Sequence, residues 1–495
     1  MLNRLHYLKL MSSKQQTITL FFIFIISLLG CSKGYDDKII YFGVAQNPQN
    51  LNPLIANDAA SEKINNLIYT SLFYYDEKSN LQSELVSYKM LSPKEYVFTL
   101  KKDLPFFHHG KKMNLDDIMA TFTHIIDEGL SSKAIELKKV KKLKKLSPKQ
   151  FKIYLNSSDL NFVHHLNFAV LPSDLINQNH NFSLSPIGSG PFSFHPSIQN
   201  IKIKRVVDGQ IVEFVEIKDP TVRALKLIKN EIDIIQNDIP KETSKFLESN
   251  KTISILKSVG SNISYLGFNF NDSWLGKAEL RRAMSLAINR EQLIKFFLNE
   301  NTRLAEQIFP PEHWASKKII PLSFNPILAR EIVSKLSPDR PIEITFKTST
   351  DPFRLKIATI IQEQLDDVGI HLKIKTLDWG TYFKDIQSGN FQMYGLTWVG
   401  VKNPEIYHKI FHSSSTPPNG LNRGNFSSLL LDNLLEEARL TNHWSKVIDQ
   451  VHMQIGFIPL WYEGSIAALS KSISGYTIHS DGNWNGLTTI KKNEF

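Results

Sequence analysis

The stretch IEITFKTSTDPFRLKIATIIQEQLDDVGIHLKIKTL (342–377) decides the fold. Its two ends, 342–348 and 370–377, alternate apolar and polar residues as strands do. The segment between them, 351–369, has the spacing of an amphipathic helix and a plausible stop at Gly369. Two strands joined by a helix pair in parallel through a right-handed crossover, and ligands gather at the carboxyl ends of such strands. The sequence therefore predicts an α/β protein.

Short strands and amphipathic helices alternate along the rest of the chain, without internal repeats. Period-two segments occupy 96–100, 151–155, 201–206 and 211–217, and helical patterns occupy 277–298, 427–440 and 444–456. Pro459, in FIPLWY (457–462), favours an edge or crossing strand there. At 495 residues the chain is long enough for two or three domains.

The first thirty residues have a different character. A basic start precedes TITLFFIFIISLLG (17–30), which carries no charge and is short for a membrane span. This pattern is typical of a secretory signal peptide over 1–30, with Met11 as an alternative start. The only cysteine, Cys31, ends LLGC, which resembles the lipobox of bacterial lipoproteins. That resemblance implies cleavage and acylation at Cys31; a free cysteine beside an uncleaved helix is the alternative.

Positive charge is concentrated in one segment. The formal net charge of +10 falls to +7 when Arg4, Lys9 and Lys14 leave with the signal, and KKVKKLKKLSPK (138–149) holds seven lysines. Such a run suggests a nucleic-acid or membrane patch. Strand alternation follows at 151–155, and lysines commonly protect sheet edges from pairing, so we favour a solvated strand edge and expect no nucleic-acid partner.

The sequence lacks the constellations that enzymes need. It has no GxSxG, HExxH, Walker A or GxGxxG motif, so we expect a non-enzymatic protein with no catalytic residues and no cofactor. Side chains of adjacent residues, such as the pairs His108–His109 and His164–His165, rarely converge on one ion. His408 and His412 are better spaced, four apart on an expected helix, but a surface helix face is the favoured interpretation and we predict no dedicated metal site.

Two tryptophans fall at expected strand ends. Trp379 follows the strand 370–377, and Trp398 ends the apolar strand 391–398. We expect them to share a cleft, with core packing as the alternative.

The order of seven short segments along the chain carries more information than any one of them. These segments are LNPLIANDAASEKINNLIYTSLFYYD (51–76), DLPFFHHGKKMNLDDIMATF (103–122), SGPF (189–192), YLGFN (265–269), LRRAMSLAINREQLI (280–294), DWGTYFKDIQSGNFQ (378–392) and IPLWY (458–462). Each is weak alone. As an ordered set behind a lipobox, covering about 40–465, they resemble the family 5 extracellular solute-binding proteins, the oligopeptide- and dipeptide-binding lipoproteins of bacterial ABC importers.

This resemblance implies a two-lobed periplasmic-binding-protein clamshell (type II, cluster C-like), with an extra domain inserted in lobe one. The expected boundaries are 31–57, 181–263 and 462–495 for lobe one, 58–180 for the insert and 264–461 for lobe two. Ligand would then be enclosed by hinge closure.

The resemblance also implies ligand-binding positions. Trp379 and Trp398 match two family tryptophans near the cleft, Tyr265 matches a hinge-strand tyrosine, and Asn57, Asp58 and Ala59 match a first-lobe segment that faces ligand. A structural packing role is the alternative for each.

One position departs from the family pattern. Peptide binders typically carry an aspartate three residues after the second tryptophan, which pairs with the ligand α-amine; here that position is Val401. Glu405 could take the role after a shift of a few residues, and Asp58 is a second candidate. A buried amine without a partner would cost about 3–5 kcal/mol. Recognition of a free peptide amine therefore stays open.

The expected function is capture of oligopeptides, including wall-derived or N-blocked ones, for an inner-membrane ABC permease and its ATPase subunits. We expect a monomer, lipid-anchored at the periplasmic face of the cell membrane. A nickel chelate or glycan cargo is one alternative, for which His408 and His412 are the feature to test. A surface lipoprotein for adhesion or chaperone-like contacts, with the lysine run as interface, is another.

Overall fold

The computed structural model describes residues 38–56, 58–129, 134, 137–418 and 420–493. The expected signal peptide, Cys31 and Asn57 lie outside these residues. Within them, no helix has both the length and the apolar character that a membrane crossing requires.

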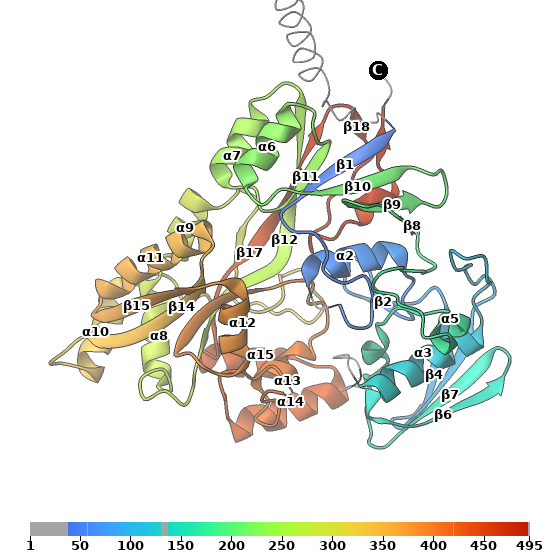
Figure 1. Cartoon of the computed structure of the whole chain (residues 1–495). Helices are drawn as coiled ribbons and strands as arrows, with labels where there is room; N and C mark the ends of the chain where they lie inside the picture. The colour runs from blue at the N-terminus through green and yellow to red at the C-terminus, as the bar shows by residue number, and fades with distance from the viewer. Residues whose placement is uncertain (1–37, 57, 130–133, 135–136, 419, 494–495) are drawn as a thin grey trace, which may run out of the picture. The chain divides into compact units, whose positions relative to one another are not determined.

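An 11-stranded sheet organises most of the chain (Figure 1). Its order is β15-β14-β16-β12-β17-β11-β1-β10-β9-β8, and β13 pairs with β17 beside this path. The strands are β1 (Ile39–Val44), β8 (Phe192–His195), β9 (Ile201–Arg205), β10 (Ile211–Glu216), β11 (Ile234–Gln236), β12 (Ile253–Phe268), β13 (Arg303–Leu304), β14 (Ile342–Ser349), β15 (Ile370–Leu377), β16 (Met393–Trp398) and β17 (Ile458–Ser470).

The predicted strand–helix–strand unit is confirmed. β14 and β15 pair in parallel from Ile342↔Ile370 onward, and α11 (Pro352–Asp366) connects them. The side chain of Asp351 accepts a hydrogen bond from the backbone N–H of Arg354 and so caps the start of α11. Gly369 has φ +88°, the left-handed conformation expected at a helix stop.

Two long antiparallel strands, β12 and β17, occupy the middle of the sheet. They pair with each other from Ile253↔Ser470 to Leu266↔Ile458, while β12 also pairs with β16 and β17 also pairs with β11. Pro459 therefore lies near the start of a central strand, which agrees with the crossing-strand alternative and not with an edge. The pair links the β14–β16 part of the sheet to the β1–β11 part.

A separate four-stranded sheet has the order β4-β5-β7-β6. It consists of β4 (Val86–Ser92), β5 (Glu95–Leu100), β6 (Val140–Ser147) and β7 (Gln150–Leu155). The lysine-rich β6 is an edge strand with mostly exposed side chains, which confirms the strand-edge interpretation of this segment. The sheet falls within the segment expected as the insert, and the domain boundaries themselves stay a prediction.

Helices flank both sheets: α2 (Ala59–Ile68), α3 (Leu115–Glu128), α5 (Ser173–Asn177), α6 (Pro220–Ile228), α7 (Lys241–Glu248), α8 (Ala278–Ala287), α9 (Arg290–Phe297), α10 (Pro326–Leu336), α12 (Trp379–Gln387), α13 (Ile406–Phe411), α14 (Leu429–Thr441) and α15 (Ser445–Met453). The segment 277–298 forms two helices instead of one. Ile288 is extended, and the side chain of Asn289 accepts from the Gln292 N–H to cap α9, so a capping residue breaks the apolar pattern.

Candidate functional site

A narrow cavity, part of it open to solvent, lies beside β12 and β16. The only charged side chain among its lining residues is that of Arg423. The lining comprises Tyr265, Gly267, Phe268, Phe270, Ile308, Tyr394, Trp398, Ile410, Phe411, Leu421, Asn422, Arg423, Gly424, Gly456 and Phe457. A mostly apolar and aromatic wall with few polar groups is typical of a ligand site.

A second narrow hollow is less suited to a ligand. Its charged groups include Arg290 and Glu306, which form an ion pair at 2.9 Å. The guanidinium of Arg290 also donates to the carbonyl oxygens of Ala305, Pro459 and Leu322. These groups are satisfied within the protein, which indicates a structural role.

Tyr265 and Trp398 form one wall of the first cavity. Ile263 of β12 lies opposite Trp398 of β16, so Tyr265, two residues along, shares its face of the sheet. The two rings stack with centroids 6.0 Å apart and planes 4° apart. Burial raises the pKa of Tyr265 well above its ordinary value, so the phenol stays neutral.

Arg423 lies near two aromatic rings. Its guanidinium carbon lies 5.4 Å from the ring centroid of Trp398 and 5.4 Å from that of Phe383, distances at which a cation is attracted to a π-face. The side chain is buried, and burial also raises the pKa of the neighbouring Tyr394, whose hydroxyl interacts with Arg423. Among the described residues no carboxylate forms an ion pair with this guanidinium.

The loop that carries Arg423 is fixed by its neighbours. Asn422 donates to the carbonyl oxygens of His412 and Phe426 and accepts from the Phe426 N–H. A Cβ on Gly424 would lie 2.0 Å from the carbonyl oxygen of Phe268, so only glycine lets the loop approach β12 this closely. The polypeptide therefore holds the cation at the cavity wall.

The structure links the two predicted tryptophans through Phe383. Trp379, the first residue of α12, is 53% exposed and stacks on Phe383 with centroids 5.8 Å apart. Phe383 and Trp398 each lie 5.4 Å from the guanidinium carbon of Arg423. Trp398 lines the cavity and Trp379 does not, so the two tryptophans are connected only through Phe383 and Arg423.

The residues after Trp398 are engaged within the protein. Val401 is partly buried against the apolar cluster that includes Tyr407. Glu405 is almost fully buried and accepts from Nε of Arg439 at 3.0 Å. Lys402 forms an ion pair with Asp481 at 2.9 Å.

The predicted first-lobe residues lie at the start of α2. Asp58 is the N-cap, and its carboxylate accepts from the backbone N–H of Ser61 at 2.9 Å. Ala59 is exposed, and neither residue lines the cavity. Asn57 lies outside the described residues. Their assignment to ligand binding stays a prediction.

Sequence reasoning missed Arg423, Phe383 and Tyr394. The three come from separate parts of the chain, and no local spacing connects them. The weak signal available was an arginine beside a glycine in NRGNF (422–426), directly before an expected helix.

This site and fold define a ligand-binding protein of the α/β class. Residues 90–417 match the family model described as bacterial extracellular solute-binding proteins, family 5 middle. The chain belongs to this family, and it is accordingly a non-enzymatic substrate-binding protein of ABC transport, acting outside the cytoplasm.

Individual relatives are distant in sequence. The chain is 24% identical to the glutathione-binding protein GsiB of Escherichia coli, over 92% of this chain and 95% of that protein. It resembles the structure of the oligopeptide-binding protein AppA from Bacillus subtilis in complex with a nonapeptide, with TM-score 0.77, 22% identity and coverage of 92% and 99%. It also resembles NikZ from Campylobacter jejuni in complex with Ni(L-His), with TM-score 0.78, 21% identity and coverage of 92% and 100%. These likenesses establish the fold.

Proposed function

We propose that this protein captures oligopeptides, wall-derived or N-blocked ones included, and delivers them to an inner-membrane ABC permease while anchored to the membrane through Cys31. One observation carries the choice of ligand. Arg423 is the only charged group in the cavity wall and it has no carboxylate partner among the described residues. A peptide supplies the missing anion through its C-terminal carboxylate.

The residues after Trp398 also favour binding of a ligand carboxylate over a ligand amine. Val401 is apolar, and Glu405 is occupied by Arg439. A ligand amine therefore finds no carboxylate among the residues that line the cavity, whereas a ligand carboxylate finds a guanidinium that lies near two aromatic rings. Arginine binds carboxylates well because its planar fork of N–H groups matches the two oxygens.

The aromatic walls suit peptide side chains of varied size. Tyr265, Trp398 and Phe457 offer flat apolar surface, and ordered water can fill the remaining space around different side chains. The site is thus expected to fix the carboxylate end and to tolerate variation elsewhere.

The test compares peptides that differ only at the C-terminus. Calorimetry on the wild type should show that converting the carboxylate to an amide weakens binding about 10- to 100-fold, as expected for a lost charge-assisted hydrogen bond. In Arg423→Gln the two forms should bind alike and weakly. Arg340→Gln removes an exposed arginine outside the cavity lining and should behave as wild type.

Equal binding of the acid and amide peptides to the wild type would refute the proposed contact between the ligand carboxylate and Arg423. This comparison does not depend on how Arg423→Gln folds.

An anionic metal chelate is the second candidate cargo, because its carboxylates would meet the same guanidinium and because NikZ carries Ni(L-His) on this fold. Binding of a nickel polycarboxylate complex with no response to any peptide would favour that candidate.

A further inference from the structure

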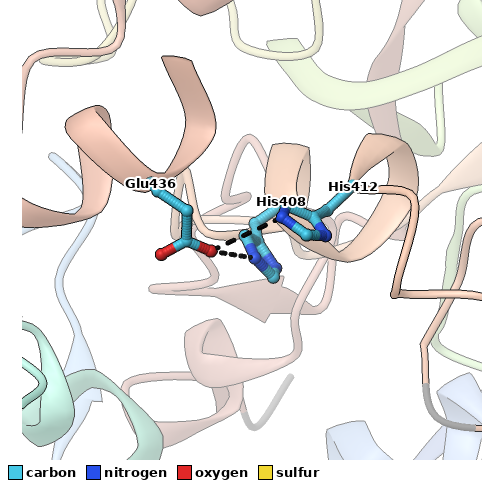
Figure 2. A group of neighbouring side chains, drawn as sticks. All are labelled: His408, His412 and Glu436. Atoms are coloured by element: carbon cyan, nitrogen blue, oxygen red, sulfur yellow. Dashed lines mark hydrogen bonds and ion pairs between the residues drawn. The ribbon is translucent and has the colours of Figure 1, made fainter. Parts of the chain in front are cut away.

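A separate cluster of nitrogen and oxygen ligands lies on α13 and α14. His408 belongs to α13, His412 is its C-cap residue, and Glu436 lies on α14. One ligand atom from each lies within 4.8 Å of the other two. Figure 2 shows the carboxylate of Glu436 facing both imidazole rings.

The spacing of the donor atoms suits a tetrahedral ion. Oε1 of Glu436 lies 2.9 Å from Nε2 of His408 and 3.6 Å from Nε2 of His412. A tetrahedral zinc ion with bonds of about 2.0–2.1 Å places its ligand atoms about 3.3 Å apart. The two observed distances bracket this value. The rings of His408 and His412 stack with centroids 4.4 Å apart and planes 23° apart, so binding through both Nε2 atoms requires the rings to turn toward each other.

The second nitrogen of each ring has a serine hydroxyl beside it. Nδ1 of His412 lies 2.8 Å from Oγ of Ser414, and Nδ1 of His408 lies 3.5 Å from Oγ of Ser415. A ring that binds metal through Nε2 carries its proton on Nδ1 and needs an acceptor there. In the metal-free protein Nδ1 of His412 also accepts from the backbone N–H of Ser414 at 3.1 Å, so the proton of this ring is on Nε2 and faces Glu436. Zinc binding through Nε2 therefore moves the proton of His412 to Nδ1, where the hydroxyl of Ser414 is the acceptor.

The charges around the cluster are compatible with a bound cation. Arg439 lies 3.3 Å from Oε1 of Glu436, but its Nε is bound to the buried carboxylate of Glu405, which offsets its charge. Asp432, whose carboxylate accepts from Ser413, adds a further negative charge near His412.

We infer that His408, His412 and Glu436 bind one divalent transition-metal ion, with zinc as the best match, in a site distinct from the ligand cavity. Imidazole and carboxylate ligands at this spacing favour zinc over magnesium or calcium, which prefer oxygen. The fourth position is left to water.

The site would brace one wall of the cavity. Ile410 lines the cavity and lies on the face of α13 opposite to His408, because successive helical residues are about 100° apart. A metal that joins α13 to α14 therefore fixes the helix that carries Ile410 without contacting the ligand.

The test is a calorimetric titration of the metal-stripped full chain with ZnCl₂, repeated on His412→Ala and Glu436→Gln. The expected result is one zinc ion per chain, a higher melting temperature with zinc, and binding weakened about 100-fold or more in each variant. His443→Ala, which removes an exposed histidine outside the cluster, should bind zinc as the wild type does. Cobalt should give the strong visible absorption of a four-coordinate ion.

Absence of saturable zinc binding, or binding unchanged in both variants, would overturn the inference and leave an ordinary ion-pair network. Thermal melting of each variant without metal shows whether it is folded. Peptide binding, measured on the same samples, should change less than about two-fold in the variants without zinc. A chain that binds zinc but no peptide would refute the proposed function alone.

Discussion

Glu405 accepts a hydrogen bond from Nε of Arg439 at 3.0 Å, and its side chain is only 4% exposed. Burial on its own would lower the pKa of Arg439, but the carboxylates of Glu405 and Glu436 outweigh it and raise that pKa. The acid that lies closest in sequence to the expected amine-binding position is therefore already neutralised within the protein. A ligand amine would have to displace Arg439 to reach it.

The first prediction concerns the peptide N-terminus. Because no free carboxylate lines the cavity, N-acetylation should change the dissociation constant by less than about three-fold, or about 0.7 kcal/mol. Calorimetry on matched free and acetylated peptides of three to six residues measures this directly. A loss of ten-fold or more on acetylation would mean that an acid outside the cavity lining, with Asp58 the first to test, approaches the amine.

The second prediction concerns Trp398. Its ring stacks on Tyr265 and faces Arg423, so Trp398→Ala removes one side of the pocket that positions the guanidinium. Peptide binding should weaken about ten-fold or more, and the free energy of unfolding should fall by about 2 kcal/mol, less than for a fully buried tryptophan. Calorimetry and urea denaturation measure the two effects.

Trp314→Ala is the matched control, since Trp314 is also partly exposed and stacks on His313, outside the cavity. It should leave peptide binding unchanged. Wild-type affinity in Trp398→Ala would remove the residue from the ligand site.

Periodicity made much of the fold predictable. The alternation in 342–348 and 370–377 predicted two strands. The helix between them predicted that the two strands pair in parallel, as the structure shows. The edge position of the lysine-rich strand was predictable from its lysines, because charged side chains on an edge strand oppose pairing with another strand.

The site was less predictable because it depends on contacts between distant segments. Trp398 could be placed at a strand end from its local pattern. The role of Arg423 becomes visible only through its contacts with Phe383 and Trp398, which lie 40 and 25 residues earlier in the chain. Likewise the spacing of His408 and His412 was visible, whereas Glu436 is brought to them by the packing of α14.

The third prediction concerns the buried Arg281 of α8. Its guanidinium donates to the carbonyl oxygens of Ile455, Leu275 and Gln454, and burial lowers its pKa to about 10. Arg281→Met should lower the free energy of unfolding by about 3 kcal/mol or more, because three buried acceptors lose their donor. Urea denaturation checks the value.

The adjacent Arg282 provides the control, because it is exposed. Arg282→Met should stay within about 0.5 kcal/mol of wild type. Similar stability of the two variants would show that the buried carbonyls find other donors.

The fourth prediction concerns the ion pair between Lys402 and Asp481 in acid. Burial alone would raise the pKa of Asp481, but Lys402 outweighs it, so the pKa lies below the ordinary 3.8. A carboxyl whose pKa is lowered in the folded state contributes its full stabilisation above the pKa of the unfolded state, and this contribution is lost as the pH falls through the pKa of the folded state.

Asp481→Asn should therefore be less stable than wild type by about 2 kcal/mol at pH 6, and the difference should shrink steadily below about pH 4. Urea denaturation from pH 6 to pH 3 tests this, with the exposed Asp339→Asn as control. A stability difference that stays constant across this range would mean that hydrogen bonding at Asp481, and not its charge, holds the segment in place.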